Sequence, residues 1–386
     1  MKIQEHISLK ELTTMKIGGT ARYFCVAETE QELKEAFAFS EEKDVPVLIL
    51  GGGSNVLIAS GELSALVIKI DLKGVVWDED GESTLVIAGA GESWDGLVAQ
   101  AVERGLWGIE NLSGIPGSVG ATPIQNIGAY GAEIKDVVEW VEVFDTKTGK
   151  VKKLRKDVCQ FSYRDSLFKK PEGKSLIVLR VALRLKKNGT PNLEYKDLQK
   201  YFYGESHSLL YPPKDGSASG GKGSTRVFVG EGFKSSGLDD SATSFKKGGI
   251  PTLAEVRDAV LSIRTGKFPD LKTHGTAGSF FKNPIISKEK FDELKRRYPE
   301  LPGFELPTTN SKLPTIKVPL AWILDNLCGL KGYSKGSVKL FEKQPIVLVH
   351  SGSASSGEVE MFAKEIMERV KEKTGIEIEW EVALMK

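Results

Sequence analysis

The sequence predicts an α+β protein of two or three domains. Ser/Thr-x-x-Glu capping boxes precede amphipathic stretches and predict helices at 29–43, 252–264 and 355–374. Ser93 begins a fourth helix, which Gly105 ends. Short apolar or alternating runs predict strands at 45–50, 66–70, 85–88, 137–145, 151–154, 176–185 and 376–384. With 386 residues, 40% of them hydrophobic, the chain is long enough to build more than one core.

The composition argues against nucleic-acid binding and membrane binding. The 53 Lys and Arg residues are dispersed and offset by 52 Asp and Glu residues, which leaves a formal net charge of +1. No apolar run is long enough to cross a membrane and the N-terminus is too polar for a signal peptide, so a cytoplasmic protein is expected. The three cysteines are far apart and none of the four histidines has metal-ligand spacing, so neither a disulfide nor a metal site is expected.

The segment 204–249 is rich in Ser, Gly and Lys and predicts a flexible insertion, with a possible short strand at 226–229. Its stretch 220–225 is similar to a P-loop. Gly223 separates the Lys from the Ser, however, and no strand precedes the stretch, so no nucleotide site is expected there.

Two glycine-rich loops are candidates for ligand binding. The first follows the run at 45–50, predicted as a buried strand, and consists of Gly51, Gly52, Gly53, Ser54 and Asn55. Its glycines can turn backbone N–H groups inward as an anion nest that suits a pyrophosphate, although a plain turn is the alternative. The second loop, 114–131, contains five glycines and two prolines. It is longer than most structural loops, which favours contact with a large cofactor.

The stretch 275–284 places Ser279 between small residues and the pair Phe280 and Phe281. Gly and Ala allow a ligand close to the backbone, and the aromatic pair can keep water off one face. A serine in such a setting can donate a proton if a neighbour polarises it, and Asn283 is a candidate. A Gly-rich turn entering a buried edge is the alternative.

Two further motifs carry charge. Arg164, between Tyr163 and Asp165, can offer a rigid fork to a carboxylate, although a surface Arg–Asp pair is the better interpretation of these residues alone. Glu379 and Glu381 alternate along the predicted last strand, where they would share one face and would ordinarily both be solvated.

Taken in order, these motifs resemble the MurB family, the UDP-N-acetylenolpyruvoylglucosamine reductases, which are also called UDP-N-acetylmuramate dehydrogenases. The matching segments are 51–56, 115–117, 123–131, 163–166, 264–267, 278–284 and 379–382. They cover most of the chain outside the insertion. No single segment is decisive, but the ordered set is specific.

The resemblance implies a two-lobed FAD-binding fold of the vanillyl-alcohol-oxidase type with a third, α+β substrate-binding domain. The implied divisions are 1–71 and 72–265 for the lobes, 266–375 for the substrate-binding domain, and 376–386 for a strand that returns to the FAD region. FAD would be bound non-covalently, because no histidine falls where a covalent link is expected, and NADPH would reduce it. The substrate would be UDP-N-acetylglucosamine enolpyruvate, reduced to UDP-N-acetylmuramate for peptidoglycan synthesis. A monomer is expected.

The resemblance also implies roles for individual residues. Arg164, Ser279 and Glu381 would be catalytic, with Ser279 as the proton donor and Glu381 opposite Arg164. The implied cofactor-binding residues are Gly51, Gly52, Gly53, Ser54, Asn55, Gly114, Ile115, Pro116, Gly117, Gln125, Asn126, Gly128, Ala129 and Tyr130. The implied substrate-binding residues are Tyr163, Tyr195, Lys267 and Asn283, with Tyr195 closing over the sugar nucleotide and Arg264 near a substrate or NADPH phosphate.

The chain departs from the family pattern in the length of its insertion and in Ala383, where some members carry an Arg. The alternative function is an FAD-dependent sugar or lactone oxidase of the same fold. Such an oxidase would not need both Arg164 and Ser279, and it often tethers its flavin to a histidine. A non-catalytic UDP-sugar-binding protein would be expected to have lost these residues.

Overall fold

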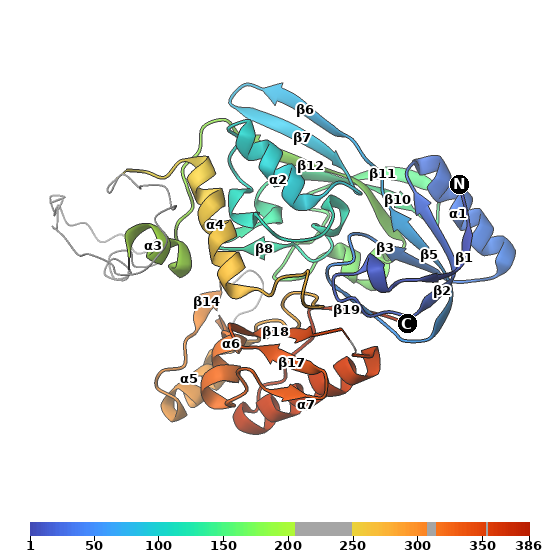
Figure 1. Ribbon diagram of the computed structural model, residues 1–386. Coiled ribbons are helices and arrows are strands. Elements are labelled where there is room, and N and C mark those ends of the chain that lie inside the picture. The colour runs from blue at the N-terminus through green and yellow to red at the C-terminus, as the bar shows by residue number, and fades with distance from the viewer. Residues whose placement is uncertain (205–248, 307–313, 353) are drawn as a thin grey trace.

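The computed structural model describes residues 1–204, 249–306, 314–352 and 354–386. Within these residues the chain forms an α+β fold, in which two sheet-containing lobes pack above a third, C-terminal region (Figure 1). The predicted insertion at 204–249, with its P-loop-like stretch and its possible strand at 226–229, lies outside the described residues except at its ends.

The first lobe contains a four-stranded sheet in the order β1-β2-β5-β3. Its strands are β1 (Gln4–Ser8), β2 (Thr20–Ala27), β5 (Glu62–Ile70) and β3 (Val47–Leu50). β2, β5 and β3 run parallel, so the connection from β2 to β3 needs a crossover, which α1 (Glu30–Lys43) supplies. The predicted capping box at its start is present, since Thr29 and Glu32 bond each other's backbone N–H groups. β3 therefore presents the first glycine-rich loop at the carboxyl end of a parallel strand, where α/β sheets commonly bind ligands.

The second lobe contains a five-stranded antiparallel sheet in the order β11-β10-β12-β7-β6. Its strands are β6 (Val75–Asp80), β7 (Ser83–Gly89), β10 (Val138–Asp145), β11 (Lys150–Arg155) and β12 (Leu176–Lys186). The helix α2 (Trp94–Glu103) is capped by Ser93 and is followed by Gly105 at positive φ, as the sequence predicts. The remaining helices of the lobes are α3 (Lys196–Tyr203) and α4 (Leu253–Lys267).

The long loop after α2 folds into short pieces instead of regular elements. These pieces are η2 (Glu110–Leu112), η3 (Val119–Ala121), β8 (Gly128–Ala129), β9 (Ala132–Glu133) and η4 (Ile134–Asp136). Three more 3-10 turns are η1 (Lys10–Leu12), η5 (Leu167–Lys169) and η6 (Pro171–Gly173). Because so few backbone groups are used by regular structure here, the loop keeps amides available for a ligand.

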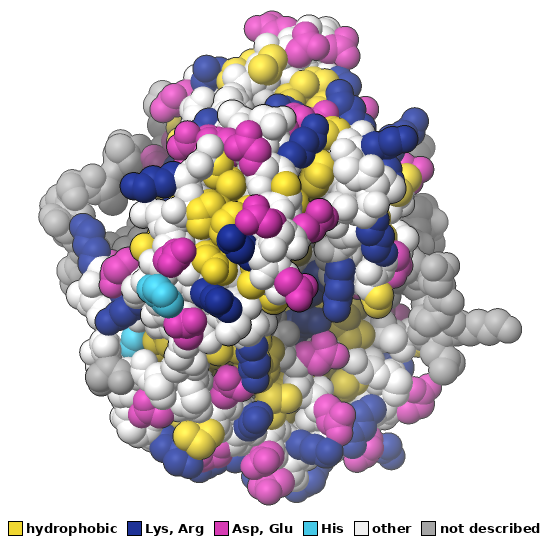
Figure 2. All heavy atoms as spheres, turned by 90° about the vertical axis from the view of Figure 1, so that its right-hand side faces the viewer, with side chains coloured by type: hydrophobic (Ala, Val, Ile, Leu, Met, Phe, Trp, Pro, Cys, Tyr) yellow, Lys and Arg dark blue, Asp and Glu magenta, His cyan; other side chains and the backbone are white. Residues whose placement is uncertain are grey.

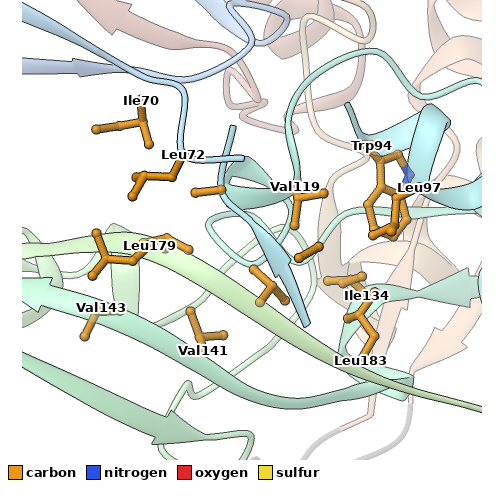
Figure 3. Packing of buried hydrophobic residues seen from close by; sticks show 14 of the residues in the cluster. Ile70, Leu72, Trp94, Leu97, Val119, Ile134, Val141, Val143, Leu179 and Leu183 are labelled. Atoms are coloured by element: carbon orange, nitrogen blue, oxygen red, sulfur yellow. The ribbon is translucent and has the colours of Figure 1, made fainter. Parts of the chain in front are cut away.

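One hydrophobic core joins the two lobes. Figure 3 shows Ile70, the last residue of β5, and Leu72 just after it, opposite Leu179 of the second sheet, with Trp94 of α2 farther along the same layer. These side chains are 5% exposed or less, and the Trp94 indole N–H donates to the carbonyl of Leu112. The apolar burial that holds the lobes together thus also fixes the start of α2 beside the second glycine-rich loop.

The C-terminal region contains two three-stranded antiparallel sheets covered by helices. Their strands are β13 (Ile285–Ser287), β15 (Thr315–Lys317) and β14 (Phe304–Leu306) in one, and β16 (Ser334–Lys335), β17 (Val338–Phe341) and β18 (Gln344–His350) in the other. The helices are α5 (Lys288–Arg297), α6 (Leu320–Trp322), which continues as the π-helical turn η8 (Ile323–Leu327), and α7 (Ser356–Thr374). The predicted capping box at Ser355 starts α7, and Gly375 ends it in the left-handed conformation.

The end of the chain returns to the first lobe (Figure 1). β19 (Ala383–Met385) pairs in parallel with β4 (Val56–Ile58), which directly follows the first glycine-rich loop. The prediction of a regular strand over 376–384 was wrong for most of its length, because 376–382 only forms an isolated bridge between Trp380 and Phe281. The prediction of a buried strand at 45–50 was also too strong: β3 is an edge strand, in which Ile49 is 37% exposed.

The surface agrees with the balanced composition. On the face shown in Figure 2, Lys and Arg side chains are interspersed with Asp and Glu. Among the described residues, none of the helices is both long and apolar enough to span a bilayer.

Candidate active site

A cleft of about 310 Å³ lies where the two glycine-rich loops, α4 and the C-terminal region meet. The predicted site residues that line it are Ser54, Asn55, Ile115, Pro116, Gln125, Gly128, Ala129, Tyr130, Arg164, Tyr195, Lys267, Ser279, Asn283 and Glu381. The predicted residues outside its lining are Gly51, Gly52, Gly53, Gly114, Gly117, Asn126 and Tyr163. Side chains separated by more than 200 positions in the sequence therefore share one cleft, including the three proposed as catalytic.

The two glycine-rich loops are in direct contact. The amide of Gly52 donates to Oγ of Ser118 (3.2 Å), and Oγ of Ser54 donates to the carbonyl of Pro116 (2.8 Å). A Cβ atom on Gly52 would lie 2.7 Å from Cα of Gly117, so the loops could not approach this closely with a larger residue there. Sequence reasoning missed Ser118, whose hydroxyl joins the loops; its place between Gly117 and Gly120 was the available signal.

Successive backbone amides on these loops are left available. Within the described part of the chain, the N–H groups of Gly53, Ser54 and Asn55 make no hydrogen bond, and neither do those of Ile115 and Gly117. Adjacent unpaired amides are the feature that binds pyrophosphate in anion nests. The loops thus fit the diphosphate of FAD, the cofactor that the family resemblance implies.

Gly278 provides a second test of the fit to a ligand. It lies on the cleft wall with φ +74°, and a Cβ atom built on it would meet no protein atom within 4 Å. The space beside its backbone is therefore open toward the cleft, as close approach of a flat ligand requires.

Arg164 occupies a strained and well-held position. Its φ of +53° is in the left-handed region, which non-glycine residues seldom adopt, and it forms the corner of the turn closed by Ser162 and Asp165. Its Nη2 donates to the carbonyl of Gly128 (2.8 Å), and Nζ of Lys169 donates to the carbonyl of Arg164 (3.2 Å). The expected surface pair with Asp165 is not its ion pair, because the guanidinium points inward instead.

Glu381 is the ion-pair partner of Arg164. Its Oε1 lies 3.0 Å from Nε of Arg164, and the two side chains are 10% and 20% exposed. Burial raises the pKa of Glu381, and the Arg164 guanidinium opposes that rise. The expectation that both carboxylates of the last segment are solvated was wrong for Glu381, while Glu379 is 74% exposed and pairs with Lys282.

Backbone pairing brings Ser279 to the same place. Ser279 bridges Val347 of β18, and the next residue, Phe280, accepts a hydrogen bond at its carbonyl from the amide of Glu381 (2.9 Å). Phe280 and Phe281 are fully buried in the C-terminal core and do not line the cleft. The interpretation of this aromatic pair as a water-excluding wall was therefore wrong; the pair anchors the segment that carries the hydroxyl.

Tyr163 lies behind the cleft lining, next to Asn283, which does line the cleft. Burial raises the pKa of Tyr163, while nearby Arg164 and Asn283 act in the opposite direction. The ring of Tyr163 also lies 5.1 Å from Nζ of Lys317. Oδ1 of Asn283 accepts from the amide of Leu320 (2.9 Å) at the start of α6, which fixes the orientation of the amide group.

Asn126 is fully buried and positions other groups. It has φ +45°, and its Nδ2 donates to the carbonyl of Ser162 and to Oε2 of Glu133, both at 2.9 Å. Through Ser162 it supports the turn that carries Arg164.

Tyr195 lies at the mouth of the cleft, 44% exposed, just before α3. Its ring meets that of Tyr130 edge to face with centroids 5.2 Å apart, and burial raises the pKa of Tyr130 to about 12. Lys267, in the last turn of α4, pairs with Asp197 in the first turn of α3. The contact joins the two helices on either side of the insertion.

Several lining residues were not in the predicted set. Arg264 was assigned only generally to a phosphate; its Nε donates to the carbonyl of Gly114 (3.0 Å), and burial lowers its pKa. Gln344, the polar first residue of β18, precedes the apolar run 345–349 and could have been recognised by that contrast. The other additional lining residues are Ile127, Asp197, Phe268, Ala277, Gly278, Pro319, Ala321 and Ile346.

The described residues contain no group of three or more His, Cys, Asp or Glu side chains placed to hold a metal ion. The cysteines at 25, 159 and 328 are unpaired thiols. The buried His350 serves the fold, since its Nε2 lies 2.6 Å from the carbonyl of Met15. The cleft itself offers the Arg164–Glu381 ion pair, the Ser279 hydroxyl, and loop amides without a hydrogen-bond partner among the described residues.

Comparison with known proteins places this geometry in a family. Residues 21–155 match the model of an FAD binding domain, and residues 270–385 match that of the UDP-N-acetylenolpyruvoylglucosamine reductase C-terminal domain. The reductase of Pseudomonas aeruginosa is 35% identical over 380 residues, covering 98% of each chain. That of Amoebophilus asiaticus is also 35% identical, over the full length of both chains.

The fold agrees with a solved member. The structure of UDP-N-acetylenolpyruvylglucosamine reductase (MurB) from Thermus caldophilus superposes with a TM-score of 0.60 over the full length of both chains, at 24% identity. Full-length relatives at 35% identity, with family models at both ends of the chain, establish that the chain belongs to the UDP-N-acetylenolpyruvoylglucosamine reductase (MurB) family.

Proposed function

We propose that this chain is an FAD-dependent oxidoreductase that uses NADPH to reduce UDP-N-acetylglucosamine enolpyruvate to UDP-N-acetylmuramate, a step in peptidoglycan precursor synthesis. The observation that carries the proposal is the convergence of Arg164, Ser279 and Glu381 on the cleft beside two loops with unpaired amides. The full-length relatives, which are named UDP-N-acetylenolpyruvoylglucosamine reductase, support the proposal. The oxidase alternative does not account for the match to the reductase C-terminal domain over residues 270–385.

The glycine-rich loops would hold the cofactor. The amides of 53–55 and of the 115–117 turn would bind the diphosphate of FAD, and Gln125, Gly128, Ala129 and Tyr130, which line the cleft, would border the ring system. When bound, FAD supplies hydride transfer from NADPH to the enolpyruvyl group. The divisions at 1–71, 72–265, 266–375 and 376–386 remain our proposal for the domains.

Arg164 would stabilise charge on the substrate. Addition of hydride to an enol ether conjugated with a carboxylate places negative charge on that carboxylate, so a fixed cation next to it lowers the barrier. The Gly128 carbonyl and Glu381 hold the guanidinium in one orientation before substrate arrives. Glu381 would therefore act by orienting Arg164 and by balancing its charge when the site is without substrate.

Ser279 would donate the proton that completes the reduction. A hydroxyl is a weak acid, so it must lose its proton to a carbon that already carries developing negative charge. The Ser279 backbone is fixed by pairing on both sides, to β18 and to Glu381 through Phe280. Such rigidity suits a proton transfer between atoms held in one geometry.

The nucleotide part of the substrate would lie toward α3 and α4. Lys267 and Arg264 supply positive charge for a diphosphate, while Tyr195 and Tyr130 offer aromatic edges. Asn283 would donate a hydrogen bond from its oriented amide. NADPH would use the same cationic region before the sugar nucleotide binds.

The replacement Ser279→Ala tests the proposal. Anaerobic flavin reduction by NADPH should keep its rate, because that half-reaction needs no proton from Ser279. Flavin reoxidation by UDP-N-acetylglucosamine enolpyruvate should slow by about 100-fold or more, the usual contribution of a general acid. Stopped-flow absorbance of the flavin measures both rates.

Ser287→Ala is the matched control, because Ser287 caps α5 in the same region but lies away from the cleft. It should leave both half-reactions unchanged. Equal slowing of both half-reactions in Ser279→Ala would refute the proton-donor role. A wild-type protein that retains no FAD, or oxidises NADPH without regard to the enolpyruvyl substrate, would refute the function itself.

A further inference from the structure

The second glycine-rich loop contains a turn, 114–117, whose two ends are held by the first turn of one helix. At one end, the amide of Gly114 donates to Oδ1 of Asp95 (2.6 Å). At the other end, the amide of Trp94 donates to the carbonyl of Gly117 (3.1 Å). Trp94 and Asp95 are the first two residues of α2, so the start of this helix determines where the turn lies.

Contacts with α4 also restrict the position of the 114–117 turn. Gly114 has φ +68°, and a Cβ atom on it would lie 2.9 Å from the Leu261 side chain and 3.1 Å from that of Arg264, both on α4. Nε of Arg264 donates to the Gly114 carbonyl (3.0 Å). Both peptide groups of Gly114 are thus held, one by α2 and one by α4, while the amides of Ile115 and Gly117 make no hydrogen bond within the described residues.

Asp95 is itself fixed by a fork from α4. Nη1 of Arg257 donates to Oδ1 of Asp95 (2.7 Å) and Nη2 donates to Oδ2 (3.0 Å), a bidentate geometry that sets the plane of the carboxylate. Arg257 is 13% exposed and Asp95 36%. Oδ1 of Asp95 accepts from both Arg257 and Gly114. Loss of the Arg257 hydrogen bonds would therefore free the carboxylate to rotate and move the oxygen that accepts from the Gly114 amide.

Three residues on one face of α4 act on this assembly. Arg257, Leu261 and Arg264 follow each other at helical spacing, with the fork first, the packing contact next and the carbonyl contact last. The same helix ends at Lys267 in the cleft. Contacts from both α2 and α4 therefore fix the position of the 114–117 turn relative to the cleft.

We propose that Asp95 and Arg257 are positioning residues that hold the 114–117 turn in the conformation that presents its amides to the cofactor. The inference rests on the proposed binding of FAD by these loops. Neither side chain lines the cleft, so their effect reaches the cofactor through Gly114.

Rebinding of FAD to the FAD-free full-length protein, followed by quenching of flavin fluorescence, tests the inference. Asp95→Ala should weaken FAD binding at least tenfold, because the Gly114 amide loses its acceptor. Asp95→Asn should weaken it less than threefold, because an amide oxygen can still accept. Arg257→Lys should lie between these, because it keeps the charge and loses the fork.

A charge-reversed double variant, Asp95→Arg with Arg257→Asp, separates positioning from simple stabilisation. It restores an ion pair between α2 and α4 but offers no acceptor to the Gly114 amide. FAD binding should therefore remain at least tenfold weaker than in the wild type. If that variant does not fold, the graded series of Asp95→Asn, Arg257→Lys and Asp95→Ala decides alone. Arg184→Lys is the control, because Arg184 also pairs with carboxylates, Asp80 and Glu139, but lies on β12 away from the loops; it should bind FAD as the wild type does.

The inference is overturned if Asp95→Ala binds FAD within twofold of the wild type, or if the charge-reversed variant regains wild-type affinity. It is also overturned if Arg184→Lys loses as much affinity as Arg257→Lys, since the effect would then be a general loss of stability. A wild-type protein that binds no FAD would refute the proposed function instead, so the two failures are distinguishable.

Discussion

Two glutamates of the last segment, two positions apart, meet opposite environments. Glu381 is buried beside Arg164, and burial raises its pKa, so it binds a proton more tightly in the folded state than in the unfolded chain. Glu379 is exposed, and hydrogen bonding to Lys282 lowers its pKa. An alternating pattern predicted equal environments, and the difference arises because 376–382 is not a regular strand.

The two environments predict pH dependences of opposite sign. A raised pKa contributes stability that is present below the ordinary value near 4.5 and is lost as the pH rises through the folded value. We therefore compare the free energies of unfolding of Glu381→Gln and of the wild type. The value for the variant minus that for the wild type should increase as the pH rises above about 4.5.

Glu379→Gln, the same chemical change two residues away, should behave in the opposite way. A lowered pKa contributes stability that is present above 4.5 and is lost as the pH falls, so this variant should be less stable than the wild type at neutral pH and should match it in acid. Urea unfolding at a series of pH values measures both differences. Parallel curves for the two variants would contradict the assigned environments.

The short parallel pair of β19 and β4 carries Glu381 to the site. The amide of Ala383 donates to the carbonyl of Asn55 (3.1 Å), and Nδ2 of Asn55 donates to the carbonyl of Glu381 (3.2 Å) and to Oε1 of Gln125 (2.6 Å). The first glycine-rich loop, the second loop and the last segment are thus linked through one asparagine. We therefore expect a substitution in β19, outside the cleft lining, to affect the chemistry of the cleft.

Ala383→Pro tests this linkage. Proline removes the donor to Asn55 and so loosens the segment that holds Glu381. Flavin reoxidation by the enolpyruvyl substrate should slow by about tenfold, since misplacement of positioned groups is costly in catalysis. Ala383→Gly keeps the donor and should remain near the wild-type rate in the same stopped-flow assay. An unchanged rate in Ala383→Pro would show that β19 does not position the carboxylate.

Most elements with local signals could be predicted from the sequence. The capping boxes at Thr29, Thr252 and Ser355 all form, because both partners lie within one helical turn. The pairing of Arg164 with Glu381 was also expected, from the family resemblance, but most other partners of the site residues were not. Ser118 and the Asp95–Arg257 fork carry no motif of their own, and their contacts join segments 66 and 162 positions apart.

The aromatic pair Phe280 and Phe281 shows a further limit of local reasoning. The sequence predicted that the pair would keep water off one face of the ligand. Both are buried because Trp380 packs against Phe280 on one side, with centroids 5.0 Å apart, and the C-terminal core surrounds the other. The burial of both rings thus depends on the chain end, which returns to this segment about 100 positions later.

The N-terminal segment ties the C-terminal region to the first lobe. Met15 and Ile17 belong to the C-terminal core although they precede β2, and the hydroxyl of Thr14 donates to the carbonyl of Thr276 (2.7 Å). Gly275 packs so tightly here that a Cβ atom on it would lie 2.3 Å from the Met15 carbonyl. Because these contacts are shared, we expect the two regions to unfold together.

His350 lies at the centre of this junction and makes its stability depend on pH. Its Nδ1 accepts from the amide of Gly352 (3.1 Å), so Nε2 carries the proton and donates to the carbonyl of Met15 (2.6 Å). Burial lowers the pKa of His350 below its ordinary value of 6.5. A lowered histidine pKa means that the neutral form is favoured in the fold, so its contribution is present above pH 6.5 and is lost as the pH falls through the folded value.

The variant His350→Gln should therefore be less sensitive to acid than the wild type. The thermal midpoint of the wild type should fall relative to that of the variant below pH 6.5, because protonation of Nδ1 removes the acceptor for Gly352 and charges a buried ring. His6→Gln is the matched control, since His6 is 63% exposed on β1 and takes no part in the junction, so an effect confined to His350→Gln assigns the acid sensitivity to the junction. Circular dichroism and flavin release, followed together, should show one transition in each case. If His350→Gln and the wild type lose stability in parallel as the pH falls, another group is responsible, and two separate transitions would mean that the junction does not couple the regions.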